Sequence, residues 1–146
     1  MVVLDSSLVL ARMLADPRAA FAEAIIRRAV TESALAPSLL PFEVLHVMTA
    51  RLRQGQLTEA DRERQLRLFA TFPIELEPPP DAERLLAITR QADIHGLSGY
   101  DATFLELALR NDAEFATLDG QLADAGWRSG LTVHHIEKDL TQRARP

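Results

Sequence analysis

Short apolar runs alternate with helix-length amphipathic segments along the whole chain. Val2–Leu4 is an unbroken apolar run of the kind that forms a strand buried on both faces, and it stops at Asp5. Similar short runs predict further strands at 34–36, 74–76, 114–118 and 131–136. This alternation is typical of a parallel sheet covered by helices. We therefore expect an α/β fold, a three-layer α/β/α sandwich with a central, mostly parallel sheet of four or five strands.

Capping residues, glycines and prolines set the expected helix ends. Ser6 and Ser7 are candidates to cap the first helix, and Thr58 with Asp61 three residues later is a capping box in which Asp replaces Glu. The three prolines at 78–80 end the strand before them, because proline has no N–H to give to a sheet. They form a rigid connector. The expected helices cover 8–14, a segment opening at Pro17, 39–53, 58–72, 81–94, 101–111 and 121–125.

A chain of 146 residues is long enough to bury a core without covalent cross-links. We expect one domain over residues 1–140 and a polar tail over 141–146 that frays. The absence of cysteine excludes disulfides and thiolate metal sites. The start of the chain has Asp5 where an export signal would need basic residues followed by an apolar stretch, and no apolar run approaches the ~20 residues of a membrane span. These features predict a soluble, cytoplasmic protein with no membrane partner.

Four acidic residues occupy positions that bring them to one edge of such a sheet. Asp5 follows the first strand, and Asp119 follows the strand at 114–118. The carboxyl ends of parallel strands lie along one edge, and helices that follow strands begin there. Glu43 and Asp101 lie in the first turns of two helices. The sequence therefore predicts that all four carboxylates meet in one cleft.

Each of these acids also has an ordinary structural explanation. Asp5 and Asp119 suit the caps of the helices that follow them, while Glu43 and Asp101 complement helix dipoles. However, two carboxylates about 4 Å apart repel by ~4 kcal/mol at an effective dielectric constant of about 20. A sheet edge with four of them is costly unless cations or protons neutralise it. Capping alone does not explain this concentration of acids.

Oxygen ligands without any cysteine favour the hard cations Mg²⁺ or Mn²⁺ over zinc. The chain has 16 Lys and Arg against 21 Asp and Glu, a net charge of −5, so it has no general attraction for nucleic acid. Divalent ions in the cleft would neutralise the carboxylates and let an anionic phosphodiester enter. Paired ions of this kind activate a water molecule and stabilise the attacking and leaving oxygens of a displacement.

Four motifs, taken in order, resemble the PIN domain and in particular the VapC ribonuclease toxins. They are Val-Leu-Asp-Ser-Ser at 3–7, Pro-Phe-Glu-Val-Leu at 41–45, Leu-Ser-Gly-Tyr-Asp-Ala at 97–102 and Ala-Thr-Leu-Asp at 116–119. The matching order of strands and helices covers nearly the whole chain. The resemblance implies a single PIN-like nuclease domain.

The resemblance also assigns roles to residues. The catalytic and metal-binding residues that it implies are Asp5, Glu43, Asp101 and Asp119. Asp5 and Asp101 would contact the metal directly, with the other two completing the coordination or acting through water. Ser7 and Thr117 fall on hydroxyl positions near the metal. Where PIN relatives often carry a further Asp or Asn after the last motif, this chain has Gly120 and then Asp124, so a fifth ligand is not predicted.

The resemblance implies a Mg²⁺- or Mn²⁺-dependent endoribonuclease toxin that is inhibited by a VapB-like antitoxin and forms a homodimer. A non-catalytic PIN-like interaction module, whose acids act as caps or bind a partner's arginines, is the alternative. A phosphate-accepting receiver domain ranks lower, because Lys138 follows the last strand and does not close a strand end near the acids.

Several other residues carry weaker signals. His46 lies on the same helical face as Glu43 but is expected to be a supporting or core histidine, and Arg12 is a candidate contact for a phosphate. The arginine-rich segment 51–67 has a net charge of +2 from five arginines and three acids; it is read as a solvated helix hairpin, an RNA path or a partner contact. Most aromatic residues, Phe42 among them, are expected in the core, and Tyr100 is a candidate to stack on a base.

Overall fold

A computed structural model of the chain describes residues 1–136, so the predicted tail at 141–146 lies outside the described residues. Within them, five parallel strands form one sheet in the order β3-β2-β1-β4-β5. The strands are β1 (Val2–Leu4), β2 (Ala34–Pro37), β3 (Ile74–Glu77), β4 (Glu114–Ala116) and β5 (Val133–His134). The predicted α/β/α sandwich with a parallel central sheet is confirmed.

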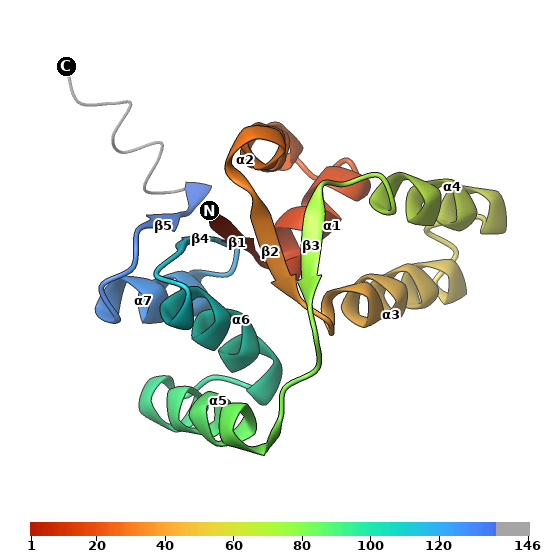
Figure 1. The fold of residues 1–146 in the computed structure, drawn as a ribbon. Coiled ribbons are helices and arrows are strands. Elements are labelled where there is room, and N and C mark those ends of the chain that lie inside the picture. The colour runs from red at the N-terminus through yellow and green to blue at the C-terminus, as the bar shows by residue number, and fades with distance from the viewer. Residues whose placement is uncertain (137–146) are drawn as a thin grey trace.

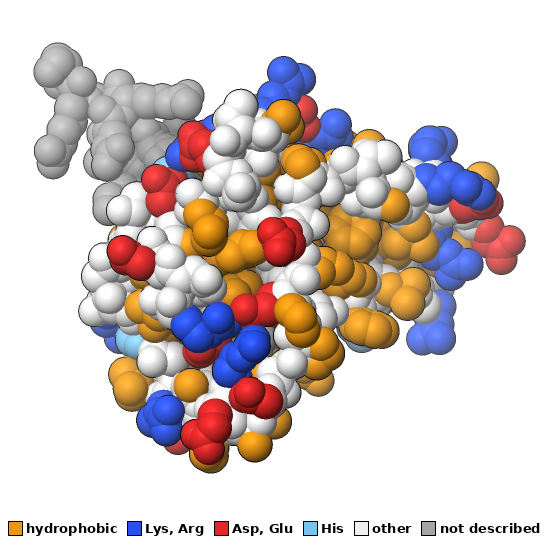
Figure 2. All heavy atoms as spheres, in the orientation of Figure 1, with side chains coloured by type: hydrophobic (Ala, Val, Ile, Leu, Met, Phe, Trp, Pro, Cys, Tyr) orange, Lys and Arg blue, Asp and Glu red, His pale blue; other side chains and the backbone are white. Residues whose placement is uncertain are grey.

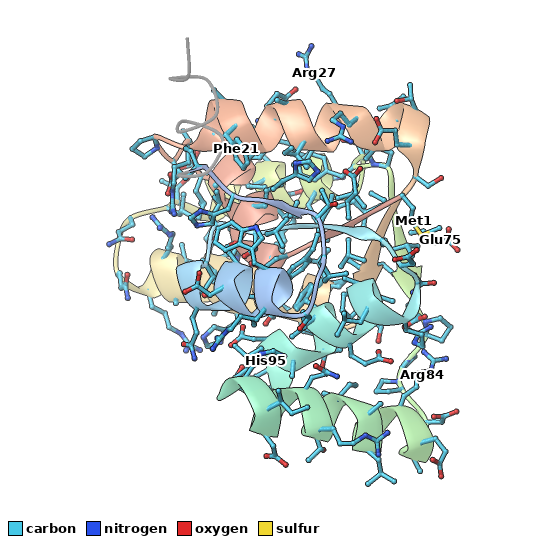
Figure 3. The ribbon with its side chains drawn as sticks, turned by 90° about the vertical axis from the view of Figure 1, so that its left-hand side faces the viewer. Met1, Phe21, Arg27, Glu75, Arg84 and His95 are labelled. Atoms are coloured by element: carbon cyan, nitrogen blue, oxygen red, sulfur yellow. The ribbon has the colours of Figure 1, made fainter. Side chains whose placement is uncertain are left out.

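The helices lie on both faces of this sheet (Figure 1). They are α1 (Ser6–Met13), α2 (Ala19–Glu32), α3 (Leu40–Arg53), α4 (Glu59–Phe69), α5 (Ala82–His95), α6 (Gly99–Arg110) and α7 (Gly120–Arg128). In the side view of Figure 3, α2, which carries Phe21 and Arg27, and α5, which carries Arg84 and His95, lie on opposite sides of the molecule. The α3–α4 hairpin projects from the body of the domain.

The central strand β1 is buried on both faces. Val2 and Leu4 belong to one apolar cluster with α1 and α2, whereas Val3 belongs to a second cluster with α3, α6 and α7. This division follows from the alternation of side chains along a strand, which sends successive residues to opposite faces. The unbroken apolar run Val2–Leu4 is therefore explained by helices covering both faces of the sheet.

Most predicted helix ends are confirmed, with two informative differences. The capping box of Thr58 and Asp61 is present, and α5 ends at Gly96, which adopts the left-handed conformation at φ 66°. Of the two caps predicted for α1, the Asp5 cap is confirmed and the serine cap is wrong, because the Asp5 side chain accepts a hydrogen bond from the Ser7 N–H.

The helix predicted at 121–125 is longer in the structure, Gly120–Arg128. Gly126 lies inside it, although glycine is a poor helix former. A Cβ atom at this position would lie 2.8 Å from Val133 Cγ2 and 3.2 Å from Phe115 Cδ1. Gly126 therefore lets α7 pack closely against β4 and β5, a contact that helix propensity does not reveal.

None of the helices in residues 1–136 combines the length and the apolar composition that a bilayer span requires.

Candidate active site

Asp5 lies at the carboxyl end of the central strand and is buried, with 4% of its surface exposed. Its Oδ2 accepts hydrogen bonds from the hydroxyls of Ser7 and Thr117, the latter at 2.8 Å. The Asp5 N–H donates to the carbonyl of Ala116 at 2.9 Å, which ties the ends of β1 and β4 together. Burial raises the pKa of the Asp5 carboxyl, and the hydrogen bonds from Ser7 and Thr117 oppose this shift.

Asp119 is connected to Asp5 through the hydroxyl of Thr117. The Asp119 N–H donates to Thr117 Oγ1 at 3.0 Å, and Thr117 is fully buried behind the two acids. The Asp119 side chain caps α7 by accepting from the Leu122 N–H at 2.8 Å through Oδ1. The predicted capping role of Asp119 is therefore present, and its Oδ2 makes no hydrogen bond within residues 1–136.

Glu43 lies in the first turn of α3, which follows β2. Burial raises its pKa to about 7, a hydrogen bond with the Ser6 side chain lowers it, and the charges of Asp5 and Asp101 raise it further. Its Oε2 is buried and has no hydrogen-bond partner within residues 1–136. These effects show that Glu43 lies within electrostatic range of two other predicted site acids.

Asp101 lies in the first turn of α6, where it forms a reciprocal cap with Ser98. The Ser98 hydroxyl donates to Asp101 Oδ2 at 2.6 Å, and the Asp101 N–H donates to Ser98 Oγ at 3.1 Å. The predicted reason for its position is wrong, because α6 follows α5 and not a strand. Asp101 reaches the site because the chain turns back at Gly96 between these two helices.

The predicted meeting of the acids is thus only partly seen. Glu43 interacts electrostatically with Asp5 and with Asp101, and the Asp119 backbone is linked to Asp5 through Thr117. No three His, Asp or Glu side chains of residues 1–136 are arranged as a ready-made metal-binding group. The Asp101 and Asp119 carboxylates face their own helix N-termini instead, each with one oxygen outside these hydrogen bonds.

The residues fit a hard divalent cation in two respects. Glu43 Oε2 is a buried oxygen without a partner, and Asp5 is a buried carboxylate beside it in the electrostatic network. A buried, unpaired oxygen of this kind is costly unless a proton or cation satisfies it. Asp5 and Asp101, the two acids within electrostatic range of Glu43, also offer oxygen ligands, which Mg²⁺ and Mn²⁺ prefer.

A cavity of about 480 Å³ opens beside Glu43. It is lined by Ser6, Leu10, Leu39, Phe42, Glu43, His46, Val47 and Tyr100. The expectation that Phe42 packs in the core is wrong, because 72% of its surface is exposed, and Tyr100 is 69% exposed. His46 is also exposed and is not a core histidine.

Sequence reasoning left Phe42 and His46 out of the site and treated Tyr100 only as a candidate. A local signal was present, since Phe42 directly precedes Glu43 and Tyr100 directly precedes Asp101. An aromatic residue next to a site acid in the first turn of a helix can be buried in the core or exposed at the site. Only the packing of α3 and α6 decides which.

Other candidates lie away from the acids or are already paired. Arg12 forms an ion pair with Glu23 of α2, so it is not a free phosphate contact. Asp124 is exposed on α7, and its side chain makes no hydrogen bond within residues 1–136. Lys138 lies outside the described residues.

Five parallel strands with acidic side chains at the carboxyl ends of β1 and β4 define a class of α/β/α domain that carries an acidic site at one edge of its sheet. The sequence model of the PIN domain family matches residues 2–128. The chain belongs to this family, whose members are generally nucleases.

Solved structures share this fold at low sequence identity. PAE2754 from Pyrobaculum aerophilum superimposes with a TM-score of 0.69 at 21% identity, covering 98% of this chain and 88% of that one. VapBC2 from Rickettsia felis, bound to a DNA fragment from its promoter, gives 0.66 at 11% identity, covering 92% and 98%. FitAcB from Neisseria gonorrhoeae gives 0.51 at 20% identity, covering 91% and 96%. A comparison with curated protein sequences found no match.

Proposed function

We propose that the chain is a Mg²⁺- or Mn²⁺-dependent endoribonuclease toxin that hydrolyses RNA phosphodiester bonds and is inhibited by a cognate VapB-like antitoxin. The observation that carries this proposal is Glu43 Oε2, a buried oxygen without a hydrogen-bond partner in residues 1–136, on a carboxylate within electrostatic range of Asp5 and Asp101. Membership of the PIN domain family supports nuclease chemistry at these acids.

The residues that would hold the metal are Asp5, Glu43, Asp101 and Asp119. When bound, the metal supplies an activated water molecule and neutralises charge on the phosphodiester. Ser7 and Thr117 hold the Asp5 carboxylate at the end of β1, which fixes its orientation without a second acid. The Glu43 carboxyl, with a pKa of about 7, gains or loses its proton near neutral pH.

An antitoxin partner is proposed on two grounds. The four sequence motifs are similar to those of the VapC toxins, and the fold is similar to that of VapBC2 from Rickettsia felis over 92% of this chain. We propose that the chain forms a homodimer in the same assembly and acts in the cytoplasm.

The test is RNA cleavage by purified chain with Mg²⁺ or Mn²⁺, with and without chelator. Asp101→Asn should reduce cleavage by roughly 100-fold, because it removes a ligand charge while the Ser98 cap can still form. Asp93→Asn changes an exposed acid on α5 outside the site and serves as the matched control. Circular dichroism checks that both variants are folded.

Calorimetry with Mn²⁺ separates the proposal from the interaction module. Heat of binding in the wild-type chain that is weaker in Asp101→Asn, which keeps the other three acids, supports a metal site made by these acids. No heat and no cleavage of several RNA classes would favour a non-catalytic module, and cleavage by Asp101→Asn at the wild-type rate would remove Asp101 from the site.

A further inference from the structure

The cavity beside Glu43 continues along α1 and α3 into a second cavity of about 420 Å³. The two share Leu10 and Val47, so together they form one groove, which we call the α1–α3 groove. One end lies at the acidic site, because it includes Glu43 and Ser6. The other end includes Arg18 and Arg51.

Two exposed aromatic rings line the acidic end of the groove. Phe42 comes from α3 and Tyr100 from α6, so the rings reach this cavity from different elements. Each ring belongs to the residue that precedes a site acid. Exposed aromatic rings beside a polar reaction centre suit the flat face of a nucleobase, since every base offers a π surface for stacking.

Among the residues that line it, the far end of the groove carries two arginines and one acid, which leaves one positive charge in excess. Arg18 is paired with Asp16 through two hydrogen bonds of 2.8 and 2.9 Å. Arg51 has no ion pair or side-chain hydrogen bond within residues 1–136. The pKa of Asp16 is lowered to about 2, mainly by Arg18 and to a smaller extent by Arg51, so the Arg51 charge acts within this cavity.

Arg51 differs in this respect from most arginines of the chain, which are paired with carboxylates. Of the arginines within residues 1–136, those with no hydrogen bond or ion pair are Arg51, Arg53, Arg62 and Arg90. Three of these lie on α3 and α4, and Figure 2 shows basic side chains gathered over that end of the molecule. Arg51 is the one that lines the groove.

We propose that the α1–α3 groove binds a short stretch of the single-stranded RNA substrate next to the scissile phosphate. A nucleobase stacks on Phe42 and Tyr100, and a phosphate further along the strand contacts Arg51. Glu43 and Arg51 are eight residues apart on α3, about 12 Å along the helix axis, so the strand extends along the groove between them. This inference rests on the proposed function and specifies how that site takes its substrate.

RNA affinity in an inactive background tests the groove directly. Each variant is combined with Asp101→Asn, and binding of short single-stranded RNA oligonucleotides that carry 2-aminopurine is measured in Mg²⁺ by fluorescence and anisotropy. Phe42→Ala and Tyr100→Ala should each weaken binding by about tenfold and reduce the quenching of 2-aminopurine. Leu45→Ala, a change at another exposed apolar residue of α3 outside the groove lining, should leave both unchanged.

The Arg51 contact has a separate signature in the salt dependence. Arg51→Gln should lower the slope of log affinity against log salt by about 0.7, the value for one phosphate on a single strand. Arg53→Gln removes an unpaired arginine two residues further along α3 that does not line the groove, and it should retain the wild-type slope.

Unchanged affinity, quenching and salt slope in the groove variants, with cleavage by the otherwise wild-type chain intact, would overturn the groove and leave the nuclease proposal standing. No cleavage of RNA by the wild-type chain in Mn²⁺ would instead overturn the proposed function and the groove with it. Normal RNA binding by the groove variants, together with loss of a co-purifying partner protein, would show that the groove is a protein-docking surface and would also overturn the inference.

Discussion

Glu43 shows at the residue scale how burial and charge conflict at the acidic edge. Its carboxyl is half-buried, one of its oxygens has no hydrogen-bond partner in the described residues, and two further carboxylates lie within electrostatic range. In a structural capping role this arrangement would only cost stability. In a metal site the same arrangement lets a cation satisfy an oxygen that the protein leaves unpaired.

This conflict predicts a pH dependence of stability in the metal-free protein. The pKa of Glu43 is about 7 in the folded chain against 4.5 in the unfolded one, so between these values only the folded state holds the proton. The free energy of unfolding should therefore fall as pH rises from 4.5 to 7. Because the carboxyl is partly solvated, the loss from Glu43 should be on the order of 2 kcal/mol.

Chemical denaturation in chelator across this pH range measures the effect. Glu43→Gln should flatten the profile and be more stable than the unchanged chain above pH 7, whereas Glu83→Gln on the exposed face of α5 should keep the original profile. Asp5, whose pKa is also raised by burial, should contribute a slope of the same sign that remains in Glu43→Gln. Identical profiles for Glu43→Gln and the unchanged chain would show that the Glu43 carboxyl is solvated.

At the scale of elements, the site depends on how helices dock on the sheet. Arg110 of α6 donates to both carboxylate oxygens of Glu77, at the end of β3, and to buried Glu106 in its own helix. Arg84 of α5 also pairs with Glu77 at 3.0 Å. These contacts join β3, α5 and α6, and so help to fix the helix that carries Tyr100 and Asp101.

The packing of α7 on the sheet gives a second testable consequence. Gly126→Ala should destabilise the fold by about 1 to 3 kcal/mol, because the new Cβ would lie 2.8 Å from Val133 Cγ2 and close to the Phe115 ring. Gly120→Ala is the matched control, since a Cβ at Gly120 meets nothing within 4 Å. Thermal unfolding in chelator measures the stability of both variants. Equal melting temperatures would show that α7 can shift away from β5 without cost.

At the scale of the whole molecule, the net charge of −5 opposes RNA binding. The arginines of α3 and α4 that form no ion pair within residues 1–136 provide local attraction, but the acidic edge next to the groove repels a phosphate until cations neutralise it. Affinity for RNA should therefore depend on the divalent cation, although this ion would contact only the phosphate at the acidic site.

The Asp101→Asn chain should accordingly bind single-stranded RNA about tenfold more tightly with Mg²⁺ than with chelator, a difference of ~1.4 kcal/mol. Fluorescence anisotropy at constant ionic strength measures it, with Na⁺ replacing Mg²⁺ to keep general screening equal. Equal affinity in the two buffers would mean that the acids lie too far from the bound phosphates to affect them.

Local patterns in the sequence determined the elements of this fold and the positions of the acids along them. The apolar run Val2–Leu4, the capping box at Thr58 and the glycine at 96 each act over a few residues, so their consequences can be predicted without knowing the rest of the chain. The same holds for Asp5, which directly follows β1, and for Asp119, which comes three residues after the end of β4, because both strands belong to a parallel sheet.

The tertiary structure alone decided which side chains meet and which remain exposed. Asp101 reaches the site through the turn between α5 and α6, and Phe42 and Tyr100 are exposed because no element of residues 1–136 covers the cavity that they line. Arg51 has no ion pair within residues 1–136, although Asp16 lines the same cavity, because the Asp16 carboxylate is paired with Arg18. Burial, exposure and pairing depend on contacts between segments remote in sequence, whereas capping and strand patterning depend on neighbours along the chain.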